Sequence, residues 1–286
     1  MSHTSAGAMP QEANILTFRQ ADSKESPGDR PFVAIVRDRE HMSVWLRDRS
    51  PALQWIEVEG LLHDFEVWTL AAEDTGEVPL DVVLVEPARE FSDLYRLVDV
   101  RAGRDVRVSI PAKPGFLKAV RLAASLGLSV RLLPGQPTGE VLDELQEALA
   151  FYLRDSMVEA PIEFFHSALA WLNGASTGSL WRVLEKDPAV YQRDTLDVTR
   201  SQPSNLGIDP SEDFGAVFLG RLITSGAECA SCPWCHFCAG YFKWPDPDYS
   251  CTGVKLLFSA LRAAVDEIED DLSAFETQSA GSQSSL

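Results

Sequence analysis

Short apolar runs rich in β-branched residues recur through the first half of the chain. "FVAIV" (32–36) and "VVLV" (82–85) are continuous apolar runs, which are typical of strands covered on both faces of a parallel sheet. "VRVSI" (106–110) alternates apolar and polar residues, and "LSVRLLP" (128–134) adds a further apolar run. The pattern predicts strands at all four places.

Segments with helical spacing lie between and after these strands. "PGFLKAVRLAASLG" (114–127) and "GEVLDELQEALAFYL" (139–153) each place apolar residues on one helical face. From Pro161 onward the pattern becomes mostly helical. The alternation of strand and helix predicts an α/β fold over residues 31–200, either a partial (β/α) barrel or an open parallel-sheet body.

The ends of the chain are polar and lack apolar periodicity. We therefore expect residues 1–30 and 274–286 to be disordered, because such segments cannot offset their ordering entropy. "TRSQPSNLGIDPSEDFG" (199–215) has the composition of a linker. It separates the α/β body from a small cysteine-rich module, which we expect to span residues 201–273 and to end in a helix.

The module ends in a helix predicted from Thr252 to Leu272. Its acidic end, "DEIEDDL", opposes the helix dipole, so we expect it to fray or to bind a cation. One face carries an apolar stripe that must pack on something. The stripe consists of Val254, Leu257, Phe258, Leu261, Val265, Ile268 and Leu272.

Charge narrows the choice of partners. The chain carries 43 acidic and 25 basic residues, a net charge of −18, which repels phosphate backbones and anionic lipid. We therefore expect neither nucleic acid nor membrane as a partner, and a basic partner instead. The N-terminus lacks the pattern of a secretory signal, which favours a cytoplasmic protein.

All five cysteines of the 286-residue chain lie between positions 229 and 251. Cys229, Cys232, Cys235 and Cys238 are spaced C-x2-C-x2-C-x2-C, and Cys251 follows after twelve residues. In a reducing compartment such a cluster indicates a metal site rather than disulfides. A dense run with one remote cysteine is typical of an iron-sulfur cluster, whereas zinc ribbons use two separated C-x2-C pairs, so iron-sulfur is favoured and zinc remains the alternative.

The segment "CASCPWCHFCAGYFKWPD" with the later Cys251 resembles the SPASM, or twitch, module of radical S-adenosylmethionine (radical SAM) enzymes. That resemblance implies one 4Fe-4S cluster held by Cys229, Cys232, Cys238 and Cys251, with Cys235 as the surplus thiol. Phe242 stands where a further SPASM cysteine would be, and no cysteine precedes Cys229, so the C-x3-C-x2-C motif that cleaves SAM is absent.

Two functions of different class follow. The resemblance implies a degenerate, accessory member of the family that has no independent radical SAM activity. It would work with a protein partner, a radical SAM enzyme, and a peptide substrate in peptide modification. The alternative is a non-catalytic binding or scaffold protein whose zinc or cluster only ties the terminal helix to the body.

Other residues have ordinary explanations. In a chain this acidic we expect the carboxylate pair Glu57 and Glu59 on a solvated face. His236 lies inside the cysteine run and could replace a thiolate, although five thiols already exceed the four that one cubane needs. The aromatic residues Tyr241, Phe242 and Trp244 could shield a metal from water or belong to an ordinary core.

Overall fold

The computed structural model describes residues 16–20, 30–48, 50–193, 207–208 and 212–283. The predicted linker at 199–215 and the expected disordered residues 1–15, 21–29 and 284–286 lie wholly or mostly outside this part of the chain. No helix in the described ranges combines the length and apolarity needed to cross a bilayer.

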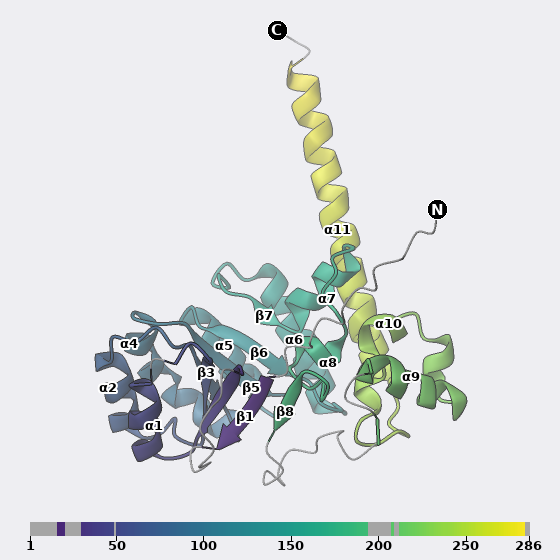
Figure 1. Ribbon diagram of the computed structural model, residues 1–286. Coiled ribbons are helices and arrows are strands. Elements are labelled where there is room, and N and C mark those ends of the chain that lie inside the picture. Colours follow the sequence, from purple (N-terminus) through teal and green to yellow (C-terminus); the bar gives the residue numbers. More distant parts are fainter. Residues whose placement is uncertain (1–15, 21–29, 49, 194–206, 209–211, 284–286) are drawn as a thin grey trace, which may run out of the picture.

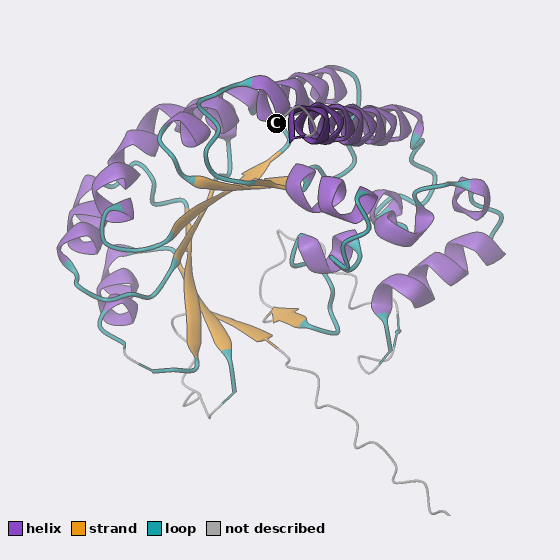
Figure 2. Cartoon of the chain, turned by 90° about the horizontal axis from the view of Figure 1, so that it is seen from above, coloured by secondary structure: helices purple, strands orange, loops and turns teal. Residues whose placement is uncertain are grey.

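The body is a single curved sheet whose eight described strands are all parallel, in the order β7-β6-β5-β4-β3-β2-β1-β8. Figure 2 shows the sheet as a half-barrel with the layer of helices outside its curve. The strands are β1 (Leu16–Gln20), β2 (Phe32–Val36), β3 (Leu53–Glu59), β4 (Leu80–Val83), β5 (Val106–Pro111), β6 (Ser129–Leu133), β7 (Ile162–Glu163) and β8 (Tyr191–Arg193).

Helices follow the strands in sequence and continue into the C-terminal region (Figure 1). The α-helices of the body are α1 (Arg39–Leu46), α2 (Phe65–Glu73), α3 (Pro87–Glu90), α4 (Val98–Arg101), α5 (Leu117–Ser125), α6 (Glu140–Arg154), α7 (Phe165–Leu172) and α8 (Leu180–Val183), with the 3-10 helix η1 (Phe91–Leu97) between α3 and α4. The C-terminal region contains α9 (Phe214–Thr224), η3 (Glu228–Ser231), α10 (Cys235–Cys238), η4 (Tyr241–Lys243) and α11 (Thr252–Gln283).

The predicted α/β class is confirmed, and the half-barrel matches the partial-barrel form of that prediction. The structure also differs from the sequence expectations in three elements. β4 begins at Leu80, two residues before the predicted run. β1 lies inside the segment for which we expected no order. The terminal helix does not fray at its acidic end but continues past Leu272 to Gln283, so the disorder expected from residue 274 onward is wrong for 274–283.

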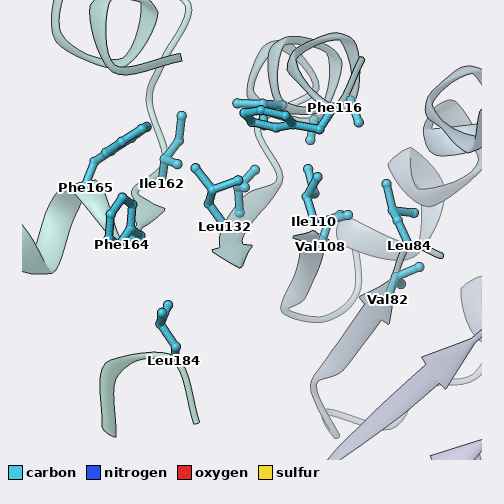
Figure 3. Close-up of a cluster of buried hydrophobic side chains, with 14 of the residues drawn as sticks. Val82, Leu84, Val108, Ile110, Phe116, Leu132, Ile162, Phe164, Phe165 and Leu184 are labelled. Atoms are coloured by element: carbon cyan, nitrogen blue, oxygen red, sulfur yellow. The ribbon is translucent and has the colours of Figure 1, made fainter. Parts of the chain in front are cut away.

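Alternate strand residues point to the helical layer and form the main core. Val82, Val108, Ile110 and Leu132 are at most 1% exposed, and Figure 3 shows Leu132 and Ile110 near the ring of Phe116. Because the side chains of a strand alternate between faces, the residues next to them point into the half-barrel. The same hydrophobic core continues into the cysteine-rich region, where it includes Cys229, Phe237, Phe242 and Cys251.

The inner face of the half-barrel is charged over β4, β5 and β6, whereas over β1 and β2 it carries the buried apolar residues Phe18, Val33 and Ile35. Asp81 on β4 accepts hydrogen bonds from the Ser109 hydroxyl (2.6 Å), from Arg107 (2.9 Å) and from Arg131. Burial alone would raise the pKa of Asp81, but the charges of Arg131 and Arg107 outweigh it and hold that pKa below its ordinary value. Glu57 lies beside Asp81 in the register and is fully buried, so the expected solvated face is wrong for this residue.

Glu185 joins this charged face to the far side of the half-barrel. It follows α8 in the segment that leads from β7, at one edge of the sheet, to β8, at the other. Its carboxylate pairs with Arg107 (2.8 Å) and with Arg131. Two carboxylates therefore share two arginines, and the segment between β7 and β8 is held across the open side of the sheet (Figure 2).

We expect Asp81→Asn to lower the free energy of unfolding by about 3–5 kcal/mol, because it leaves two largely buried guanidinium groups short of a counter-charge. Equilibrium urea denaturation measures the loss. Glu86→Gln, which breaks an exposed pair with Lys113, is the control and should change the midpoint little. Equal effects of the two substitutions would show that the inner network does not stabilise the fold.

Candidate metal centre

The structure brings all five cysteines around one small cavity. Cys229 lies in η3, and Cys232 follows in the link to α10. Cys235 and Cys238 begin and end α10, and Cys251 directly precedes α11. Their side chains line a space of about 20 Å³, which is room for about one water molecule. The spacing in the sequence therefore becomes a convergence of thiols in the fold.

A sharp turn after Cys238 brings the chain back to the cavity. Ala239 and Gly240 both have left-handed backbone conformations, with φ of 47° and 75°. The carbonyl of Ala239 accepts a hydrogen bond from the indole of Trp181 (2.8 Å). A Cβ on Gly240 would lie 2.6 Å from a methyl group of Leu222, so only glycine fits there without a shift.

Aromatic rings form the apolar wall of the cavity. Trp234, Phe242 and Phe258 line it, and the ring of Phe258 lies 5.6 Å from that of Trp234 and 6.1 Å from that of Phe242. Of the three aromatic residues considered from the sequence, only Phe242 has this position. Tyr241 packs on Trp181 (5.2 Å), and Trp244 packs on Phe218 (6.2 Å).

A charged group closes the other side of the cavity. Glu228 accepts a hydrogen bond from the backbone N–H of Cys251 (3.0 Å) and pairs with Lys243 (3.1 Å) and with Lys255. Hydrogen bonds from Lys255 and from Cys251, together with Lys243, lower the pKa of Glu228 to about 2. Two ammonium groups thus stand beside the thiols, where they favour negative charge.

Burial holds three of the thiols in their neutral form. Burial raises the pKa of Cys238 to about 12 and that of Cys251 to about 11, and it also raises the pKa of Cys229. The charges of Cys251, Cys229 and Cys232 raise the pKa of Cys238 further, so these four sulfurs are near neighbours. A cation in the cavity would reverse this balance, because metal binding deprotonates its thiol ligands.

The thiols surround the cavity without meeting at one point. Within the part of the chain that the structure describes, no group of three or more His, Cys, Asp or Glu side chains is arranged to hold a metal ion. His236 is exposed and does not line the cavity. The donor set at the cavity is therefore five soft thiols and no imidazole.

The cavity lies near the carboxyl end of β6. Gln136, in the loop after that strand, donates hydrogen bonds to the carbonyls of Phe242 (3.0 Å) and Asp246 (2.8 Å). Tyr249 donates to the carbonyl of Pro137 in the same loop. The cysteines therefore stand at the carboxyl end of the strands, which is where sites in parallel α/β proteins usually form.

A roomier space lies at the opposite edge. About 800 Å³ is lined by the amino ends of β4, β5 and β6 and by Trp55, Arg101, Arg104 and Arg107. Arg101, Arg104 and Arg107 already bond to a backbone carbonyl or a carboxylate. Its lining contains no thiol, and the carboxylate Asp81 that lines it is already paired with Arg107 and Arg131.

Comparison with known proteins identifies no relative: the chain has no significant match to a protein family, to a curated protein or to a solved structure. The candidate site therefore rests on its own geometry. From the sequence we identified the five cysteines, and Phe258 only as part of the apolar stripe, but not Trp234 or the Glu228 group. Helical spacing of Phe258 with Val254 and Leu261 was the available signal for one of these, and the others depend on tertiary contacts.

Proposed function

We propose that the chain binds one 4Fe-4S cluster and acts as an accessory protein to a catalytic partner that modifies a peptide. The observation that carries the proposal is the convergence of five thiols on one aromatic-walled cavity at the carboxyl edge of a parallel half-barrel. Thiolates are the usual ligands of iron-sulfur clusters, so the donor set fits this cofactor.

The arrangement of the sulfurs supports a cluster over a single zinc ion. Zinc ribbons bind one ion with two separated C-x2-C pairs, whereas here four cysteines lie in one dense run and the fifth is remote. Ligands of a cubane bind different irons and need not converge on one atom. Because a cubane is larger than the present space, loading it requires the cysteine segment to move outward.

Cys229, Cys232, Cys238 and Cys251 would hold the cluster, with Cys235 as the surplus thiol. The set is the one that the SPASM resemblance implies, and all four of these cysteines line the cavity. Cys251 also adjoins the N-terminus of α11, where the helix dipole favours a thiolate.

When bound, such a cluster supplies the uptake and release of an electron. The chain's own residues set the conditions for it. Trp234, Phe242 and Phe258 exclude water, while Lys243 and Lys255 offset the negative charge of the thiolates. Since no cysteine is available for a SAM-cleaving motif, the radical would come from the partner, a radical SAM enzyme.

The alternative function is a binding or scaffold protein in which the metal, zinc or cluster, has only a structural role. One observation favours it. The cavity is closed by Val254, Lys255 and Phe258 of α11, so any metal there would fasten that helix to the body.

Metal analysis separates the two functions. Protein purified without oxygen should contain about four irons and matching sulfide per chain, with visible absorption, as one cubane requires. Stoichiometric zinc with no visible absorption would contradict the cluster and support the structural alternative.

Cysteine variants test the ligand set. Cys251→Ala should lose the iron and loosen α11, because it removes the ligand next to the start of that helix. Cys235→Ala is the matched control and should keep both iron content and thermal stability. Loss of iron in Cys235→Ala with retention in Cys251→Ala would assign the metal to the dense run alone.

Dependence on a partner is tested with SAM. Purified alone under reducing, oxygen-free conditions, the chain should form no 5′-deoxyadenosine. The reason is that no cysteine precedes Cys229 to bind a SAM-cleaving cluster. Chromatographic detection of that product in turnover amounts from the isolated chain would overturn the accessory role.

A further inference from the structure

The terminal helix leaves the body halfway along its length. Its stripe residues Val254, Leu257, Phe258, Leu261 and Val265 are buried at 5% exposure or less, but Ile268 is 49% and Leu272 is 59% exposed. Figure 1 shows the C-terminal part of α11 projecting from the molecule. From Val265 to Gln283 the helix extends about 27 Å at 1.5 Å per residue.

The exposed residues continue a heptad pattern. Leu261, Val265, Ile268 and Leu272 follow one another at intervals of four, three and four residues, the spacing of a coiled-coil seam. The first two seam residues, Leu261 and Val265, are buried against the body. The last two, Ile268 and Leu272, are exposed to solvent, where a further helix could pack on them.

The charges that flank the seam are acidic. With Val265 and Leu272 at the a positions, Glu269 falls at e and Asp271 at g, the positions that select the partner helix. After Arg262 the sequence has six acidic residues and no basic one. A second copy would place like charges opposite each other in either orientation, which disfavours self-association.

A groove beside the seam offers space for a partner side chain. A space of about 570 Å³ lies between α6 and α11. Its walls include Leu149, Leu153 and Arg154 of α6 and Ala264, Ile268 and Asp271 of α11. Ile268 and Asp271 therefore belong to both the groove and the seam.

We infer that the projecting half of α11 is a docking site for a basic amphipathic helix on another polypeptide, which packs apolar residues on Ile268 and Leu272 and aligns lysine or arginine with Glu269 and Asp271. The inference gives a chemistry to the partner of the proposed function and rests on that proposal for the partner's role. Binding itself needs neither the cluster nor catalysis.

Two synthetic helical peptides of three heptads test the site against the full chain by fluorescence anisotropy. Both have Ile and Leu at a and d, one has Lys at e and g, and the other has Glu there. The Lys peptide should bind, and more weakly as salt rises, because exposed charges are screened. The Glu peptide should not bind. Equal binding of both peptides, or of neither, would overturn the inference.

Variants locate the contact. Leu272→Ser should weaken binding of the Lys peptide about tenfold or more, because an apolar side chain no longer enters the interface. The matched control is Leu256→Ser, on the same helix and 60% exposed but off the seam, which should bind as the wild type does. A similar loss in both variants, or in neither, would place the contact elsewhere.

Charge reversal and sedimentation complete the test. Glu269→Lys with Asp271→Lys should shift the preference to the Glu peptide, and an unchanged preference would contradict the selection by charge.

Sedimentation should show a monomer at the concentrations used. A dimer that Leu272→Ser dissociates would assign the seam to a second copy. The peptide test measures binding alone, so it is independent of the metal analysis. Absence of peptide binding would not contradict the proposed cluster, and absence of iron would not contradict the docking site.

Discussion

The pairing of Asp81 and Glu185 with Arg107 and Arg131 is the interaction on which the rest of the structure depends. A half-barrel has an open inner face, and a charged inner face is tolerated only when its charges are paired. Glu185 supplies the second carboxylate from the segment that crosses from β7 to β8. Its backbone has a φ of 55°, a conformation that costs energy for a residue with a side chain. The ion pairs offset that cost and fix the route of the chain toward the cysteine region.

The charged inner face also explains which elements the sequence predicted well. β2, β5, β6, α5 and α6 lie close to the predicted ranges, because apolar runs and helical spacing report the face that packs on the helices. β3 went unrecognised because Gln54, Glu57 and Glu59 interrupt its apolar pattern. A parallel sheet is usually apolar on both faces, and β2 follows that pattern, whereas β4, β5 and β6 are apolar on the helical face and charged on the inner face. Alternation of Val with Asp or Arg in the strands was the local signal of such a face.

In the candidate site, too, some features could be predicted from the sequence and others could not. Cysteine spacing was enough to predict that the thiols lie close together, since a two-residue gap brings successive thiols to one side of the chain. The wall of Trp234 and Phe258 and the Glu228 group could not be predicted, because they depend on how α11 lies against the cysteine turns. The single core shared by Phe164 of the body and Phe242 beside the cavity (6.3 Å between ring centroids) likewise arises only in the fold.

One helix links the cavity to the exposed seam. Lys255 and Phe258, in its first two turns, close the cavity, and Leu261 and Val265 fix it to the body before it projects. An acidic helix end without tertiary contacts has little stability of its own, because short helices are marginal and acidic residues there oppose the dipole. A metal that orders the cysteine turns would therefore also fix the position of the first turns of α11. A partner helix bound at the far end of α11 would stabilise α11 as well. If the proposed metal and the proposed partner helix both bind, α11 is the element that contacts both, and any coupling between the two sites is then reciprocal.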